Sequence, residues 1–245
     1  MCSAVPADGA PVPPSFAVEY LRSLKFIGDV GDPSSGLVTP EVIRDAQAEL
    51  GLARSGVLDG PTLDLFSKPR CGVSPHWLGG AHSSPRSRRF STIGSRNEIV
   101  TYKVSAYSAN LSMAEVDMAV EGAFRRVESA TLLRFARAPP SAATWNIDIA
   151  FVPDEHGCVA PFGATVLAHA LAPKDGGDFH LKDSVDFRVN SLDYVASHEL
   201  LHSIGVGHSV DPGSLMYPVY RDVSPGSDLL SADDRDVLAL LYSRP

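Results

Sequence analysis

The sequence has no excess of basic residues and no long apolar run. Among its 245 residues, 21 lysines and arginines stand against 29 aspartates and glutamates, which gives a net charge of −8. Proteins that bind nucleic acids normally present a basic face to the phosphates, so this balance argues against a nucleic-acid partner. No stretch approaches the roughly 18 apolar residues needed to cross a bilayer, and we therefore expect no membrane span.

A visible secretory signal and a disulfide framework are also lacking. Residues 1–14 contain neither the basic nor the apolar segment of a signal peptide, so either a signal has been removed or the protein is not secreted conventionally. The three cysteines are an odd number in dissimilar contexts, which is poor evidence for disulfides. We interpret Cys71 and Cys158 as possible metal ligands and Cys2 as an incidental thiol.

The residue pattern in the first third of the chain predicts a small helical unit. An apolar stretch covers residues 18–26, Thr39-Pro40 is typical of a helix start, and a third helix is expected near Pro61. Residues 72–97 are then rich in glycine, serine, proline and arginine, which is typical of a linker. We expect a tail (1–14), a helical domain (15–75), a linker (76–89) and a second domain (90–245).

The sequence of the second domain predicts strands with helices between them. This order indicates a layered arrangement of sheet and helices. The expected strands are Ile99–Ala106, Ile147–Val152, Thr165–Ala172 and Val185–Val189. Ser112 and Glu115 form a capping-box pattern ahead of a long amphipathic helix. Further helices are expected at about 191–204 and 232–242, the last one capped by Ser231 with Asp234.

The most informative segment is HELLHSIGVGH, which runs from His198 to His208. Residues four apart share a helix face, so His198 and His202 can present two imidazoles to one ion. Gly205 would let the chain turn so that His208 becomes the third ligand and water takes the fourth position. Glu199 is then the expected general base for hydrolysis by zinc-activated water.

Chance histidines on a helix are the alternative reading, but the glycine and third histidine must also fall in register. Met216 is a second, independent signal. By default a lone methionine fills a gap in a core. Here Leu215-Met216-Tyr217-Pro218 follows the last histidine at the spacing of the Met-turn found below the zinc in metzincins.

These segments, with LSADDRDVLALLY near the end of the chain and YKVSAYS from Tyr102, resemble the matrixins, the matrix metalloproteinase family. The resemblance covers residues 17–245 and is to the minimal form of the family, a prodomain followed by a catalytic domain. It implies an α+β fold: a small helical prodomain, then a metzincin domain with a twisted mixed sheet and three helices. Leu201 departs from the usual glycine, and we expect it to be tolerated.

The segment PRCGV around Cys71 resembles the matrixin cysteine switch. The resemblance implies that this thiolate occupies the fourth zinc position in a latent form and excludes water. A buried structural thiol is the alternative. Ser74 stands where the family has the proline of PRCGVPD, and the carboxylate that pairs with the switch arginine is missing. We therefore expect weaker latency.

The linker carries Arg86-Ser-Arg88-Arg89 ahead of Phe90. A basic run in a linker is usually solvated charge. The pattern also resembles a furin-type processing site, and mature matrixins often begin with an aromatic residue. We expect cleavage after Arg89, because exposed linkers are where proteolysis is physically easiest. That would imply passage through the secretory pathway.

Three further segments resemble those that hold a structural zinc in matrixins. The expected ligands are His156, Cys158, His169 and His180. The family has an aspartate in place of Cys158, and either residue gives an anionic ligand for tetrahedral zinc. The neighbouring calcium loop is shortened and carries Lys182 where an acidic ligand is expected, so we expect calcium binding to be weak or absent.

The resemblance implies a secreted or extracellular endopeptidase that acts on proteins or peptides. Substrate is expected to bind along the strand near 166–170 by strand addition. Tyr194, Pro218 and Tyr220 are expected to form the specificity pocket. A furin-type convertase and protein inhibitors are the expected partners, and the chain is expected to be a monomer. A catalytically silent, zinc-stabilised binding module is the rival, which Glu199 disfavours, and another class of metzincin is a third possibility.

Overall fold

The computed structural model describes residues 14–28, 38–74, 93, 99–158, 162–187, 192–224 and 227–242. Its helices are α1 (Pro14–Ser23), α2 (Pro40–Glu49), α3 (Gly60–Phe66), α4 (Met113–Ala130), α5 (Leu192–Ser203) and α6 (Ala232–Tyr242), with a 3₁₀ turn η1 (Pro173–Asp175). Its strands are β1 (Arg70–Cys71), β2 (Ile99–Ala106), β3 (Arg134–Arg137), β4 (Ile147–Val152), β5 (Val166–Ala170) and β6 (Phe179–Lys182). Within these ranges no helix combines the length and hydropathy of a membrane span.

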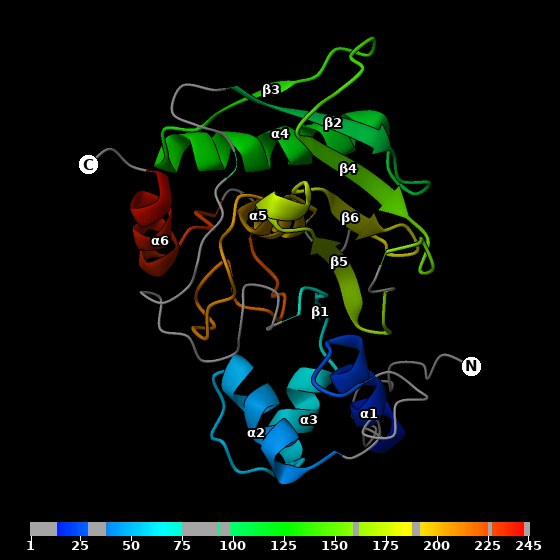
Figure 1. The fold of residues 1–245 in the computed structure, drawn as a ribbon, viewed down its shortest axis with the longest axis vertical. Helices are drawn as coiled ribbons and strands as arrows, with labels where there is room; N and C mark the ends of the chain where they lie inside the picture. The colour runs from blue at the N-terminus through cyan, green and yellow to red at the C-terminus, as the bar shows by residue number, and fades with distance from the viewer. Residues whose placement is uncertain are drawn as a thin grey trace.

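The strands form one mixed sheet in the order β1-β5-β6-β4-β2-β3. Only β5 and β6 pair antiparallel; the other neighbours are parallel. Helices α1–α3 lie at the lower end of Figure 1, and β1 leads from them into the sheet of the larger part. We call residues 14–74, which hold these three helices and β1, the helical unit. Helices α4, α5 and α6 belong to that larger part. The predicted α+β fold with a mixed sheet and three helices is confirmed.

Helix starts follow the predicted capping residues. Ser112 Oγ accepts from the Glu115 amide, while the Glu115 carboxylate accepts from the Ser112 amide at 2.9 Å, which completes a capping box. The Thr39 hydroxyl likewise accepts from the amide of Val42 at the start of α2. These local bonds satisfy backbone donors that have no partner within the helix.

Three short strands were not predicted, and one predicted strand is wrong. Residues 185–187 form bends and turns instead of the expected strand, while 188–189 lie outside the described residues. The backbone amide of Val185 donates a hydrogen bond to the Lys182 carbonyl, so the chain turns directly after β6. Strands β1, β3 and β6 have only two to four residues each, too few to show a period of two.

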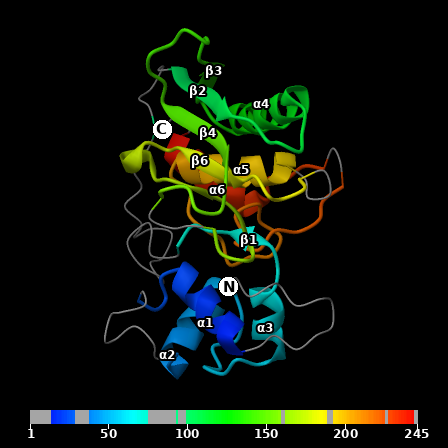
Figure 2. The ribbon, with the colours of Figure 1, turned by 90° about the vertical axis from the view of Figure 1, so that its right-hand side faces the viewer.

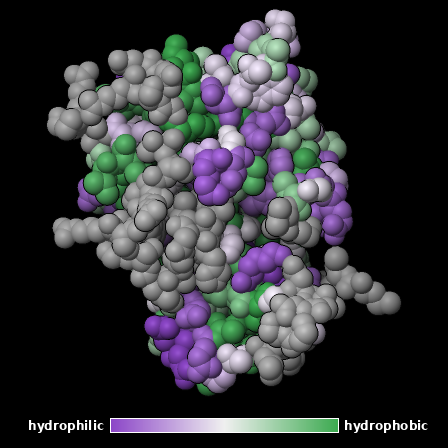
Figure 3. Space-filling view, in the orientation of Figure 1, coloured by the Kyte–Doolittle hydropathy of each residue, from purple (hydrophilic) through white to green (hydrophobic). Residues whose placement is uncertain are grey.

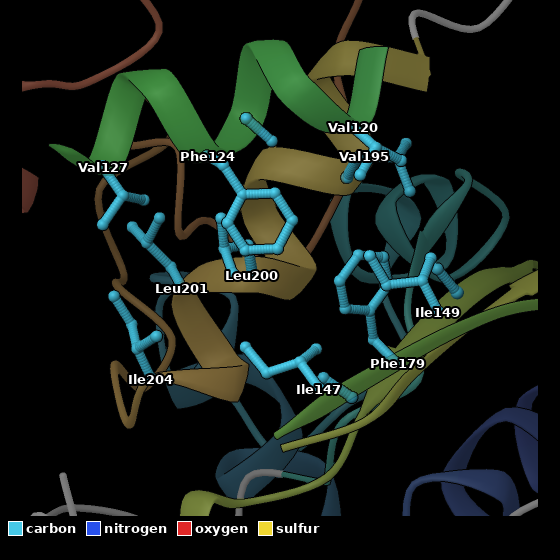
Figure 4. Close-up of a cluster of buried hydrophobic side chains, with 14 of the residues drawn as sticks. Val120, Phe124, Val127, Ile147, Ile149, Phe179, Val195, Leu200, Leu201 and Ile204 are labelled. Atoms are coloured by element: carbon cyan, nitrogen blue, oxygen red, sulfur yellow. The ribbon is translucent and has the colours of Figure 1, made fainter. Parts of the chain in front are cut away.

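The larger part has its own hydrophobic core, between α4, α5 and the sheet. Figure 4 shows Phe124 of α4, Leu200 and Leu201 of α5 and Ile147 of β4 converging, and all four are buried. Leu201, the departure from the family glycine, is fully buried in this core. It packs as an apolar residue of this core.

A second core lies inside the helical unit and extends across to the larger part. Side chains of α1, α2 and α3 are joined in it by Tyr217 and Val219, which come from the far end of the sequence. Figure 2 shows the helical unit and the larger part meeting near β1. Among the coloured residues of the face shown in Figure 3, apolar residues lie in several patches with polar residues beside them.

Candidate metal centre and active site

Helix α5 places three site residues, and the turn after it supplies a fourth. His198 and His202 lie one turn apart, so both rings leave the same face of the helix, and Glu199 follows the first. The helix ends at Ser203, and Gly205 adopts a φ of 96°, which favours glycine. The chain then reverses and brings His208 to 4.6 Å from His202, measured between ring centroids.

Each histidine has its Nδ1 atom directed at a hydrogen-bond acceptor. His198 Nδ1 lies 2.7 Å from the Leu215 carbonyl, and His202 Nδ1 lies 2.8 Å from the Val206 carbonyl. His208 Nδ1 lies 2.8 Å from a carboxylate oxygen of Glu49 in the helical unit. Because a carbonyl or carboxylate oxygen can only accept, each Nδ1 carries the proton and each Nε2 offers a lone pair.

Cys71 joins the three histidines in one cluster. The ligand atoms of Cys71, His198, His202 and His208 all lie within 4.8 Å of one another. The Cys71 amide donates to the Pro218 carbonyl at 2.9 Å, and the next amide along the chain donates to Ala168 at 2.8 Å. The thiol is therefore held from both sides, by β5 and by the segment after Met216.

This cluster fits zinc. Imidazole nitrogens and a thiolate sulfur are ligand types that zinc binds, and four of them complete its tetrahedral coordination. His198 Nε2 is fully buried with no hydrogen-bond partner among the described residues, which a buried polar atom does not tolerate without another ligand. Burial lowers the pKa of His198 to about 4, so the ring is neutral and its lone pair is available near neutral pH.

Glu199 is buried beside these ligands. Burial raises the pKa of its carboxyl to about 7, against the opposing effects of hydrogen bonds from Tyr220 and Cys71. The Tyr220 hydroxyl donates to one carboxylate oxygen of Glu199. A carboxyl with a pKa near neutrality can both accept and release a proton during a reaction. The sequence predicts Tyr220 only as a residue of the specificity pocket, and its contact with Glu199 comes from the structure.

Met216 is fully buried in the core of the larger part. The residue before it, Leu215, accepts from His198 through its carbonyl and donates its amide to Asp234 at 2.8 Å. Asp234 also accepts from the Ser231 amide at 2.8 Å, as the cap of α6. One carboxylate thus fixes both the start of α6 and the turn that orients His198. The sequence indicated only its capping role.

The expected pocket residues lie close to this centre. Tyr194 is buried on α5, and its ring stands edge-on to that of Tyr220 with the centroids 6.0 Å apart. Tyr220 is in turn edge-on to His198 at 5.2 Å. Pro218 contributes its carbonyl to the Cys71 amide. Tyr194 is therefore linked to the metal centre through Tyr220.

His156, Cys158, His169 and His180 form a second cluster of ligand atoms. The contacts His156 Nε2 to His169 Nε2, Cys158 Sγ to His180 Nδ1 and His169 Nε2 to His180 Nδ1 are 3.3, 3.2 and 3.3 Å long. In a tetrahedral site with Zn–N bonds of about 2.0–2.1 Å, two nitrogens lie about 3.3–3.4 Å apart. The spacing therefore suits one zinc ion.

Burial, followed by the charges of His180 and His156, lowers the pKa of His169 to about 3. Burial and His156 also lower the pKa of His180. Neutral imidazoles are the form that binds a metal. The electrostatic environment of this second cluster thus favours metal binding over protonation.

Lys182 lies next to this cluster, where calcium binding is expected to be weak or absent. Its ammonium is 3.0 Å from Asp154 and 3.4 Å from the Gly163 carbonyl, and the residue is buried. An ammonium group bonded to these oxygens opposes the binding of a second positive charge there. This arrangement agrees with the expected loss of the calcium site, which stays a prediction.

Arg70 has a partner that the sequence did not reveal. Arg70 is buried; its Nε donates to the Cys71 carbonyl at 2.8 Å, and its guanidinium donates to the Tyr20 hydroxyl. Its guanidinium carbon lies 5.0 Å from the centre of the Tyr20 ring. A phenol from α1 thus contacts the arginine in the absence of the expected carboxylate. Arg89 and Phe90 of the processing motif lie outside the described residues.

Comparisons with known proteins agree with this geometry. The family model described as matrixin matches residues 94–243. Mouse (Mus musculus) stromelysin-1 is 40% identical over an alignment 212 positions long that covers 83% of this chain and 43% of the relative. Matrix metalloproteinase-18 of Xenopus laevis is 31% identical over an alignment 258 positions long, gaps included, that covers 99% of this chain and 53% of the relative. The chain thus spans about half the length of these curated relatives. On this evidence it belongs to the matrixin family, as the sequence motifs indicated.

Proposed function

We propose that the protein is a zinc-dependent endopeptidase made as a latent zymogen. The observation that carries this proposal is the convergence of three α5-region histidines, a buried glutamate and a thiol from the N-terminal part of the chain. The helical unit is then a prodomain, and residues 90–245 are the catalytic domain. The names of the relatives, stromelysin and matrix metalloproteinase, support the same activity.

Different residues of the chain would have different roles in the reaction. Zinc, when bound, lowers the pKa of a water molecule and polarises the scissile carbonyl. His198, His202 and His208 would hold the ion, and Glu199 would accept the proton of the water and pass it to the leaving amine. The Tyr220 hydroxyl holds one oxygen of Glu199 in place. In the catalytically silent alternative, Glu199 would have no such role.

Latency would come from two features of β1. Cys71 would occupy the fourth zinc position, which excludes water. The backbone of β1 also pairs with β5, the strand to which we assign substrate binding. Removal of the helical unit would therefore free both the metal position and the strand edge.

Maturation would follow cleavage after Arg89. We expect N-terminal sequencing of the activated protein to find Phe90 first, because the R-x-R-R pattern directly before it resembles a furin-type processing site. We also propose secretion, action on extracellular proteins and control by protein inhibitors. A mature start well away from residues 86–92 would contradict the assigned processing motif.

A digest of a peptide library tests the endopeptidase assignment. The cleaved protein, loaded with zinc, should cut peptides at internal bonds, as read by mass spectrometry. A zinc chelator such as 1,10-phenanthroline should stop the cleavage, and added zinc should restore it. Absence of internal cleavage by the zinc-loaded protein would overturn the proposal and favour a binding module.

The buried ring of Tyr194 should make the specificity pocket shallow. We expect leucine or a similar aliphatic residue after the scissile bond to be preferred over long aromatic extensions by about 1–3 kcal/mol. Tyr194→Ala should relax this preference in kcat/KM comparisons of matched peptides. An unchanged profile would show that Tyr194 does not line the pocket.

We further propose that the second cluster binds a structural zinc, so that the chain carries two zinc ions, one for each cluster. Four protein ligands leave no position for water, and the binding energy of such a site is largely folding energy. Cys158→Ser should therefore lower the melting temperature and bring the zinc content toward one per chain. Metal analysis and thermal melts measure both effects.

Two controls accompany that variant. Cys158→Asp should largely restore zinc content, because aspartate is also an anionic zinc ligand. Cys2→Ser should change neither quantity, since we assign Cys2 to neither site. If the wild-type protein holds one zinc when fully active and Cys158→Ser melts at the same temperature, the second zinc site does not exist.

A further inference from the structure

The C-terminal end of α2 docks against the segment that carries His208. The Glu49 carboxylate lies 2.8 Å from His208 Nδ1. The next residue, Leu50, accepts through its carbonyl from the Tyr217 hydroxyl at 3.0 Å. Two consecutive residues of the helical unit therefore bond to the stretch 208–217, which surrounds the metal centre.

Gly51, which follows Glu49 and Leu50, allows the end of α2 to lie close to the segment that carries His208. Its φ is 67°, and a Cβ atom placed there would lie 2.6 Å from the Val210 carbonyl oxygen. Any residue with a side chain would be strained and would push this end of α2 away from His208. The contact between Glu49 and His208 thus belongs to a fitted interface.

The three histidines differ in what orients them. His198 and His202 are oriented by backbone carbonyls of the larger part, which belong to residues 17 and 4 positions further along the sequence. His208 is fixed by a side chain 159 residues away, in the helical unit. The side chains of Glu49 and His208 are only 13% and 5% exposed, so water screens this pair little.

A carboxylate on the far nitrogen of a metal-binding imidazole orients the ring and increases its strength as a ligand. A hydrogen bond to an ionised acceptor is also about twice as strong as one to a neutral carbonyl. His208 therefore has its strongest orienting partner only while the helical unit is present.

We propose that Glu49 is a positioning residue for the zinc ligand His208, supplied by the helical unit to the larger part of the same chain. This inference rests on the proposed zinc site. The helical unit then acts on the metal twice, by adding Cys71 as a ligand and by holding His208 through Glu49. Cleavage and release of the unit remove both effects, so the mature protein holds zinc with one orienting contact fewer.

The test uses the full, uncleaved chain loaded with zinc. In Glu49→Gln the side chain keeps its size but loses its charge. We expect the Nδ1–H proton of His208 to move upfield in long-range ¹H–¹⁵N spectra, while those of His198 and His202 stay in place. Zinc transfer to a chromophoric chelator should become faster by on the order of tenfold. Cys71 should stay protected from a thiol reagent.

Two further variants separate positioning from docking. Glu41→Gln changes a carboxylate on the same helix that is 75% exposed and pairs with Arg44, and it should leave all three readouts unchanged. Gly51→Ala should loosen the docked interface without touching the carboxylate, so that zinc release and Cys71 exposure rise together.

An unshifted His208 resonance in Glu49→Gln would overturn the inference. So would zinc release that rises only in step with Cys71 exposure, because Glu49 would then be a docking contact alone. A wild-type chain that binds no zinc would overturn both this inference and the proposed function. A chain that passes these tests but cuts no peptide after cleavage would contradict the endopeptidase proposal alone.

Discussion

Glu199→Ala should lower kcat/KM for peptide hydrolysis by about 10²–10⁴-fold, the range that a positioned general base contributes. The zinc content of the cleaved protein should not change, because Glu199 is not one of the clustered ligands. Its carboxyl is fully buried beside them with its pKa raised to about 7 by that burial. The loss should therefore fall on the chemical step and not on metal binding.

Assays of one fluorogenic peptide, with metal analysis of the same samples, measure both quantities. Glu121→Gln is a suitable control, because Glu121 is a partly exposed residue of α4 that pairs with Arg125. It should keep full activity. A Glu199→Ala protein that retains a tenth of the wild-type activity would contradict the assigned role.

Cys71→Ser should raise the basal activity of the uncleaved chain. A serine hydroxyl is a far weaker zinc ligand than a thiolate, so water can enter the fourth position. We expect a rise on the order of tenfold, since tenfold needs only about 1.4 kcal/mol of lost inhibition. Activity should remain below that of the cleaved protein, because the backbone of β1 still pairs with β5.

Initial rates of the uncleaved variant and wild type on one peptide measure this effect. Ser74→Ala is the matched control: its hydroxyl bonds to the Leu24 carbonyl within the helical unit, at 2.9 Å, and its loss should not change the basal rate. A Cys71→Ser chain as silent as wild type would remove the thiol from the account of latency.

Much of the fold follows from local sequence signals. Strand β2 and helix α6 have the predicted bounds, because alternation and capping residues mark both. Strand β1 could not be predicted in the same way. Its two residues are a strand only because β5 lies beside them, and that pairing is set by tertiary structure.

The site likewise contains residues that a local motif predicts and residues that only the tertiary structure places. His198, Glu199 and His202 sit within one helical turn, so the motif alone brings them together. Glu49 and Tyr20 carried no such signal. Each lies on an ordinary amphipathic helix, and its contact with His208 or with Arg70 depends on how the helical unit docks.

The central claim is that one zinc ion is held by His198, His202, His208 and, in the uncleaved chain, Cys71. Zinc K-edge X-ray absorption tests it most directly, because sulfur and nitrogen ligands differ in distance, about 2.3 Å against 2.0–2.1 Å. With both clusters loaded, two cysteines serve two ions, so the uncleaved chain should show one sulfur per zinc. Removal of the helical unit should halve that number as peptidase activity appears. A sulfur count that does not change on removal would contradict the claim.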